Sequence, residues 1–390
     1  MTIDRVILII LDSVGAGAAP DAADYGDEGS DTLANTARQV GGVRLPNLQR
    51  LGLGNLTEIQ GVPPMAAPVG AFGRMVQSAA GKDSAGGHWE LAGLQLDAPL
   101  ASFPQGLPKV LANELTRITG RGVLPAVATA HEAELQALGP EHMATGSWIV
   151  TTSNSSVVHI SAHEDVVPLD ELYDACRAAR TLFDAHRVGR VVASPFTGPR
   201  KDRFEHTRRR RDYALMPPRA TVFDRCQSHG VPVVGIGRIE ELFCGQGLDD
   251  SLPTQGNTDG MIKTVEILSR LDRGLVVTNL GDFDTRYGHA RDPGGYARCL
   301  EEFDVQLAML LSRARDNDLL LLTADHGNDP TRQGWDHSRE YVPILAVGPA
   351  KAAGVDLGTR TSFADVGATI CEVFGTLAPE AGEGFYGAIS

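Results

Sequence analysis

The chain has 390 residues, of which 42% are hydrophobic and 22% charged, values typical of a soluble globular protein. Its formal net charge of −14 argues against nucleic acid as a general partner, and no apolar stretch is long enough for a transmembrane helix. We therefore expect a cytoplasmic protein without a membrane partner, large enough for two domains. Its five scattered cysteines are expected to be reduced and structural: Cys176, Cys226, Cys244, Cys299 and Cys371.

The chain begins with an uninterrupted apolar run, residues 6–11, which predicts a buried strand of a parallel sheet. The run ends on Asp12, followed by a turn that contains Gly15 and Gly17. The third glycine of a dinucleotide-binding fingerprint is missing, and a carboxylate directly after the strand would repel a pyrophosphate. Asp12 is therefore better suited to binding a cation.

Residues 31–52 are predicted to form one helix, because Asp31 or Thr32 can cap it and apolar residues recur at helical spacing. In the segment 81–90, glycines surround Ser84 and leave backbone room for a bulky group such as phosphate. A serine in a glycine-rich segment is weak evidence by itself, and a plain turn remains the alternative interpretation.

The middle of the chain is predicted to be a smaller α/β domain, residues 99–216, inserted into a core formed by residues 1–98 and 217–390. Short helices and strands alternate there, and the proline pair at 217–218 stops both kinds of element. The predicted helices span residues 107–118 and 169–186, and the predicted strands span residues 148–152, 157–160 and 189–192.

A cluster of positive charge lies near the end of this inserted domain. Arg200, Lys201 and Arg203 are followed by four consecutive arginines, 208–211, in an otherwise acidic protein. Such a cluster is either an ordinary solvated loop or a rim that gathers phosphate groups.

The rest of the core is predicted to alternate strands with helices. The strands span residues 231–235, 275–280, 318–323 and 342–347, and the helices span residues 259–271, 293–314 and 365–374. Two of these strands end on carboxylates that are followed by histidines, and the remaining two do not.

Six potential metal ligands follow the ends of predicted strands: Asp12, Asp284, His289, Asp325, His326 and His337. Ligands gather at the carboxyl edge of such sheets, and carboxylate with imidazole suits zinc or manganese. Six ligands are enough for two adjacent divalent ions, a site that promotes phosphoryl displacement. A hydroxyl between the ions, for which Ser84 is the candidate, would become a nucleophile. The alternative is a set of polar turns that merely cap the following elements.

Four segments resemble the bacterial phosphopentomutase family of the alkaline phosphatase superfamily: residues 12–15, 81–90, 282–289 and 324–337. The resemblance runs from end to end. It implies an alkaline-phosphatase-like three-layer α/β core with a mostly parallel sheet, and a smaller α/β cap domain for substrate recognition.

The resemblance also implies a chemistry. One Mn²⁺, or another divalent ion, would be held by Asp12, Asp325 and His326, and a second by Asp284, His289 and His337. Ser84 falls where the family usually has threonine. Phospho-Ser84 would interconvert the 1-phosphate and 5-phosphate of ribose or deoxyribose through a sugar bisphosphate, which also serves as the activator.

Two positions depart from the family pattern, both in the inserted domain. The family usually has arginine near Ser194 and aspartate at Ser155. A lost arginine–phosphate contact removes roughly 1.5–3 kcal/mol of binding free energy. Arg238, where the family tends to have lysine, and the 200–211 cluster could compensate. The candidate substrate contacts are Ser153, Ser155, Ser194, Arg208, Arg211 and Arg238.

Three alternatives remain at this point. The first is a related mutase with a different sugar. The second is a phosphatase or a cofactor-independent phosphoglycerate mutase on the same core, which the segment 81–90 disfavours. The third is a non-catalytic sugar-phosphate-binding protein, which would be expected to have lost a metal ligand.

Overall fold

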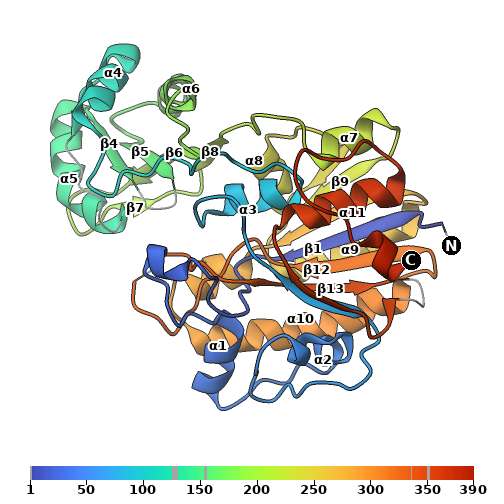
Figure 1. The fold of residues 1–390 in the computed structure, drawn as a ribbon. Helices are drawn as coiled ribbons and strands as arrows, with labels where there is room; N and C mark the ends of the chain where they lie inside the picture. The colour runs from blue at the N-terminus through green and yellow to red at the C-terminus, as the bar shows by residue number, and fades with distance from the viewer. Residues whose placement is uncertain (1, 125–130, 153–155, 335, 349–351) are drawn as a thin grey trace. The chain divides into compact units, whose positions relative to one another are not determined.

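The computed structural model describes residues 2–124, 131–152, 156–334, 336–348 and 352–390. The chain divides into two compact units. The larger consists of residues 1–99 and 217–390, and the smaller of residues 100–216 (Figure 1).

A mostly parallel sheet forms the centre of the larger unit, as predicted. Within the described residues it has eight strands, of which β13 runs antiparallel to both of its neighbours. In spatial order the strands are β10 (Asp250–Leu252), β9 (Val233–Ile236), β11 (Gly274–Leu280), β1 (Arg5–Leu11), β12 (Asp318–Thr323), β13 (Val342–Val347), β2 (Ala71–Met75) and β14 (Asp356–Arg360).

Helices cover both faces of this sheet and complete a three-layer α/β architecture (Figure 1). One layer contains α1 (Thr32–Val40), α2 (Pro46–Leu51), α9 (Asn257–Arg270) and α10 (Pro293–Arg313). The other contains α3 (Ser84–Leu91), α7 (Val222–Ser228), α8 (Ile239–Phe243), α11 (Ala364–Phe374) and α12 (Tyr386–Ile389). Three short helical turns are η1 (Ala22–Tyr25), η2 (Leu53–Asn55) and η3 (Phe283–Gly288).

The three central strands, β1, β11 and β12, determine where the candidate metal ligands lie. Every residue of β1, β11 and β12 is buried, which explains why their sequences are mostly apolar and do not alternate with polar residues. At one end of the strands, Arg5 pairs with Asp318 through contacts of 2.6 and 2.7 Å. At the other end, Leu11 lies opposite Leu280, so the chain leaves neighbouring strands at the same edge of the sheet.

The single helix predicted over residues 31–52 is wrong. Asp31 caps a helix as expected, accepting a hydrogen bond from the Ala34 amide at 3.0 Å. That helix ends at Gly41, whose φ of 83° is left-handed, and Gly42 follows with a φ of 119°. A second helix then begins at Pro46, because proline suits the first helical turn.

The smaller unit is also α/β. Its six-stranded sheet, within the described residues, has the order β3-β4-β5-β6-β7, and β8 pairs with β6. Helices α4 and α6 pack on one core of this unit, while α5 packs on a second core around Phe196 and Phe204. The elements are β3 (Val123–Leu124), β4 (Trp148–Thr152), β5 (Val157–His163), β6 (Arg190–Thr197), β7 (Glu205–His206), β8 (Arg211–Ala214), α4 (Lys109–Thr119), α5 (His131–Thr145) and α6 (Leu169–Asp184).

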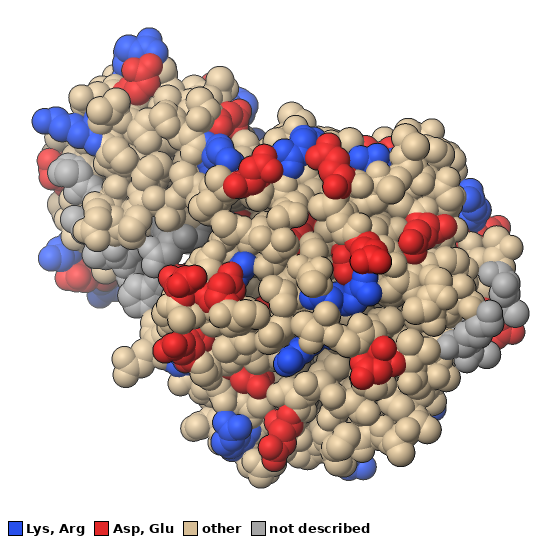
Figure 2. All heavy atoms as spheres, viewed as in Figure 1, with Lys and Arg blue, Asp and Glu red and all other residues tan. Residues whose placement is uncertain are grey.

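The surface of the larger unit carries charges of both signs (Figure 2), and most of the chain's thiols are buried. On the face of the larger unit drawn in Figure 2, acidic and basic side chains are interspersed rather than gathered by sign. No helix among the described residues is long and apolar enough to cross a membrane. The five cysteines, all within the described residues, form no disulfide, and four are buried, whereas Cys244 at the end of α8 is exposed.

Candidate active site

The strand ends bring the six predicted ligands into one cluster in the larger unit. Asp12 follows β1, Asp325 and His326 follow β12, and Asp284 lies in η3 directly after β11. These four and His337 are buried, while about two fifths of the His289 side chain is exposed, at 39%. The cluster forms because parallel strands deliver their carboxyl ends to one edge.

Asp12, Asp325 and His326 form the first group, with candidate ligand atoms that all lie within 4.8 Å of one another. The Nε2 atom of His326 is 3.1 Å from Asp325 Oδ2 and 3.6 Å from Asp12 Oδ1. This is the grouping predicted for one metal ion.

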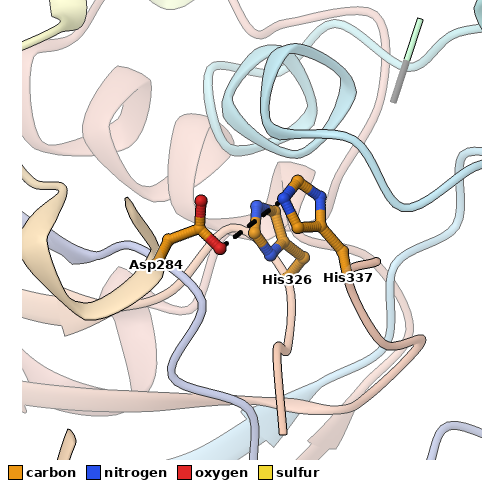
Figure 3. A group of neighbouring side chains, drawn as sticks. All are labelled: Asp284, His326 and His337. Atoms are coloured by element: carbon orange, nitrogen blue, oxygen red, sulfur yellow. Dashed lines mark ion pairs between the residues drawn. The ribbon is translucent and has the colours of Figure 1, made fainter. Parts of the chain in front are cut away.

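The second group centres on Asp284. His337 Nε2 lies 3.5 Å from Asp284 Oδ1, and His289 Nε2 lies 3.1 Å from Asp284 Oδ2. His326 also belongs here, because its ligand atom lies within 4.8 Å of those of Asp284 and His337. The rings of His326 and His337 stack with centroids 3.8 Å apart (Figure 3). The two predicted groups are therefore contiguous.

Backbone carbonyls orient two of the imidazoles. His326 Nδ1 is 3.1 Å from its neighbour's carbonyl oxygen, Gly327 O, and His337 Nδ1 is 2.7 Å from Lys82 O. Since a carbonyl oxygen only accepts, each Nδ1 carries a hydrogen, and each Nε2 atom is directed into the cluster. A partner on the outer nitrogen is the usual arrangement for a metal-binding histidine.

The field inside the cluster is strongly negative. Burial, together with the Asp325 and Asp284 carboxylates, raises the pKa of Asp12. Burial favours a lower pKa for His326, but the carboxylates of Asp325, Asp12 and Asp284 together outweigh it and raise that pKa to about 10. Burial likewise opposes ionisation of Asp284, yet the His337 and His289 imidazoles hold its pKa well below the usual range. The carboxylates of the cluster therefore favour a positive charge between them.

The donor set fits divalent metal ions. Among the described residues, neither Asp12 Oδ1 nor Asp325 Oδ2 receives a hydrogen bond, although both atoms are buried. His88 and His326 nitrogens lie 3.1 Å from Asp325 Oδ2, but not with hydrogen-bond geometry. Buried carboxylate oxygens without donors are costly unless a cation binds them. Oxygen and imidazole ligands without cysteine suit manganese or zinc.

Ser84 lies beside this cluster, but on a helix and not in the glycine-rich loop that its sequence suggested. It is the first residue of α3, and the preceding Asp83 caps the helix by accepting from the Gly86 amide at 2.8 Å. Its Oγ is 3.0 Å from His326 Nε2. The hydroxyl therefore faces the centre of the candidate ligands.

Known proteins identify the family of this site. The Metalloenzyme superfamily model matches residues 4–378. A phosphopentomutase from Anaeromyxobacter sp. (strain K) is 50% identical over 372 residues, covering 95% of each chain. One from Symbiobacterium thermophilum is 48% identical over 383 residues, covering 98% of this chain and 97% of the other. The chain belongs to the phosphopentomutase family. It is therefore an isomerase of the phosphotransferase kind, a mutase.

The fold is shared more widely than the phosphopentomutase family. Phosphoglycerate mutase from Leishmania mexicana aligns with a TM-score of 0.50 at 13% identity, covering 98% of this chain and 97% of the other. An identity this low supports only the common alkaline-phosphatase-like α/β fold, which the sequence predicted.

The phosphopentomutase-like segment 81–90 also contains residues that hold the fold together. Gly87 packs so closely that a Cβ atom would lie 2.2 Å from the Asp325 carbonyl oxygen. The Trp89 indole N–H donates to Leu242 O at 2.9 Å. The buried Glu90 carboxylate accepts from the Ser78 and Ala79 amides, both at 2.8 Å, among other donors. The segment 81–90 therefore contains residues that pack the fold as well as the candidate nucleophile Ser84.

Sequence reasoning missed two asparagines that contact the ligands. Asn279 Nδ2 donates to Asp12 Oδ2 at 2.9 Å, and Asn328 Nδ2 donates to Asp284 Oδ1 at 2.7 Å. An amide near the end of the otherwise apolar strand β11 is an available signal for Asn279. Asn328 follows His326 in the motif, but only the structure shows that its side chain points toward Asp284.

The predicted substrate contacts have varied surroundings. In the larger unit, Arg238 Nη1 lies 3.7 Å from Asp12 Oδ2, and about a quarter of its side chain is exposed, at 24%. In the smaller unit, Ser194 is buried in β6 with its Oγ 3.2 Å from His159 Nδ1. Ser153 and Ser155 lie outside the described residues.

Three arginines of the positively charged cluster make contacts within the smaller unit. Arg209 pairs with Glu164 at 2.8 Å, and Arg210 pairs with Asp212 at 2.7 Å. The Arg211 guanidinium lies over the Tyr173 ring, 3.9 Å from its centroid. These contacts favour an ordinary solvated surface for these three residues, of which Arg211 begins strand β8, whereas the exposed Arg208 keeps its place as a candidate substrate contact.

Proposed function

We propose that the chain interconverts the 1-phosphate and 5-phosphate of ribose or deoxyribose through phospho-Ser84 and a sugar bisphosphate. The observation that carries this proposal is the position of the Ser84 hydroxyl, 3.0 Å from His326 Nε2 at the centre of two ligand groups. A phosphopentomutase-family chain with a hydroxyl at that point has the parts that a phosphoenzyme mechanism requires.

Two divalent ions, with Mn²⁺ as the expected metal, would be held by two sets of side chains. One set is Asp12, Asp325 and His326, and the other is Asp284, His289 and His337. When bound, such ions lower the pKa of a hydroxyl and neutralise charge on a transferring phosphoryl group.

Ser84 is also well placed to carry a phosphate. It occupies the first turn of α3, where unpaired backbone N–H groups and the helix dipole favour negative charge. In the forward half-reaction, the P–O bond to Ser84 Oγ breaks as a P–O bond to the bare sugar hydroxyl forms. The proton of that hydroxyl ends on Ser84 Oγ. After the bisphosphate reorients, its other phosphate returns to Ser84, which releases the isomer.

Arg238 is the proposed anchor for the phosphate that does not react. Its guanidinium is partly exposed beside Asp12, and the Glu241 carboxylate lies 3.5 Å away. A guanidinium can bind phosphate through two parallel hydrogen bonds. This replaces the arginine that the family usually has near Ser194.

The test is to follow phosphate in product mixtures by ³¹P NMR. Metal-loaded protein should receive a panel of sugar 1-phosphates and 5- or 6-phosphates, with a trace of sugar bisphosphate as activator. The expected result is transfer between the 1 and 5 positions of ribose or deoxyribose. Release of inorganic phosphate alone would mean that the chain is a phosphatase. Isomerisation of another sugar only would place its pocket outside the pentose class.

A further inference from the structure

His88 is buried beside the candidate metal ligands, and nothing in the sequence predicted a role for it there. It lies in α3, one helical turn after Ser84, and only 1% of it is exposed. Its Nδ1 atom is 2.8 Å from the Ser84 carbonyl oxygen and 3.1 Å from Asp325 Oδ2. Both neighbours are acceptors, so Nδ1 carries the hydrogen and donates it to Ser84 O.

The other ring nitrogen has the opposite role. His88 Nε2 lies 3.1 Å from Asn279 Nδ2, and the same amide nitrogen donates to Asp12 Oδ2 at 2.9 Å. Turning the amide over would set its oxygen against the Asp12 carboxylate, which would be repulsive. Asn279 therefore donates to both neighbours, and His88 Nε2 accepts.

These contacts connect the nucleophile to both carboxylates of the first ligand group. One side of the imidazole holds the backbone of Ser84, and the other side reaches Asp12 through the Asn279 amide. The Ser84 hydroxyl meanwhile faces His326. The described polar contacts of His88 are with the Ser84 carbonyl, Asp325 and Asn279, and none of them is with the Ser84 hydroxyl, so His88 acts through other residues.

We propose that His88 is a positioning residue that fixes Ser84 relative to Asp12 and Asp325, by donating from Nδ1 to the Ser84 carbonyl and accepting at Nε2 from Asn279. The proposal rests on the proposed function for its effect on turnover. Its effect on metal binding can be measured without turnover. Partners of this kind commonly change metal affinity or activity by about 10- to 100-fold when they are removed.

The experiment compares three variants of the full chain. His88→Leu removes both hydrogen bonds, and His88→Asn keeps a donor close to the position of Nδ1. His142→Asn is the matched control in the smaller unit, since His142 Nδ1 donates to Ser147 O at 2.6 Å while Nε2 accepts from the His163 amide at 2.8 Å. Manganese affinity is measured on metal-free protein by competition with a chelating dye, and kcat and KM on metal-loaded protein.

We expect His88→Leu to lower kcat by about 10- to 100-fold with little change in KM, and to weaken one of two manganese sites. His88→Asn should recover part of both losses. The losses of His88→Leu and Asn279→Leu should add up to more than the loss of the double variant, because the two residues share one hydrogen bond. His142→Asn should leave manganese affinity unchanged.

Other outcomes overturn the proposal. If His88→Leu lowers only thermal stability, or if His88→Asn is no better than His88→Leu in both readouts, His88 is a packing residue. If the wild type binds two manganese ions but isomerises no pentose phosphate, the proposed function fails, and the affinity measurements still decide the role of His88.

Discussion

At the residue scale, the direction of each side chain matters as much as its identity. The sequence identified His326 and His337 as candidate ligands from their positions after a buried strand. It did not show that Gly327 O and Lys82 O hold their Nδ1 atoms, which turns both Nε2 atoms inward. Those carbonyls come from distant or irregular backbone, whose path depends on the whole fold.

Removal of one imidazole should therefore empty one half of the cluster. We expect His337→Ala to lose one of two bound divalent ions and to lower kcat/KM by more than about 100-fold, because a ligand is worth more than its outer partners. Elemental analysis of undialysed protein and steady-state kinetics measure the two effects. His186→Ala, at an exposed position, is the control. Full activity with two ions retained would remove His337 from the metal site.

At the element scale, apolar patterning predicted the central strands and most long helices. It did not predict β2 or its neighbour β14, the edge strand, which are short and contain Gly73 and Gly358. It also placed Ser84 in a loop, since glycines at 86 and 87 usually disfavour helix. Close packing of α3 against Asp325 explains Gly87, and no local pattern could reveal that contact.

Gly87→Ala tests how closely α3 must approach the site. The new Cβ would lie 2.2 Å from Asp325 O, which is backbone and cannot move aside easily. We expect α3 to shift, with kcat reduced and the free energy of unfolding lowered by about 1–3 kcal/mol. Urea unfolding and kinetics provide the measurements. Gly387→Ala, where a Cβ meets nothing within 4 Å, should change neither quantity by a comparable amount. Equal behaviour of the two variants would contradict this view.

The Arg5–Asp318 pair should contribute strongly to stability at the start of strands β1 and β12, the end of the sheet away from the candidate site. Both side chains are essentially buried, with exposures of 0% and 1%, and they pair across adjacent strands β1 and β12. Asp318→Asn leaves the guanidinium buried without its countercharge, so we expect a loss of about 3–5 kcal/mol in unfolding free energy. Asp272→Asn breaks an exposed pair at 3.5 Å and should cost less than about 1 kcal/mol. Similar urea midpoints for both variants would show that the buried pair is dispensable.

At the scale of the whole molecule, the candidate metal ligands all lie in the larger unit, whereas the candidate substrate contacts are divided between the two units, with Arg238 in the larger. Asp12, Ser84 and Asp325 lie in the larger unit, whereas Ser194 and Arg208 lie in the smaller. The first set could be predicted from the sequence because its residues lie in long motifs. The second set could not be predicted in this way. Single polar residues in the smaller unit form no sequence pattern that distinguishes a substrate-binding residue from an ordinary surface residue.

Substitution at Ser194 tests whether its unit has changed the sugar that the enzyme uses. Ser194 is 4% exposed and contacts His159, so an arginine there would have to fit a buried position. We expect the wild type to use ribose 5-phosphate efficiently. Ser194→Arg should bring no gain in kcat/KM, and overpacking should cost about 1–3 kcal/mol of stability. A clear gain in kcat/KM would instead show that the wild-type pocket lacks a phosphate contact and prefers another substrate.

The central claim is that Ser84 carries the phosphate, and peptide mass analysis during turnover tests it most directly. Manganese-loaded protein is incubated with ribose 1,5-bisphosphate, quenched and digested, for the wild type, Ser84→Ala and Ser84→Thr. The account predicts one phosphate on the peptide containing Ser84 in the wild type and on the matching peptide of Ser84→Thr, with isomerisation in both. Ser84→Ala should show neither phosphate nor isomerisation. Isomerisation by Ser84→Ala, or phosphate on a different residue of the active wild type, would contradict the account.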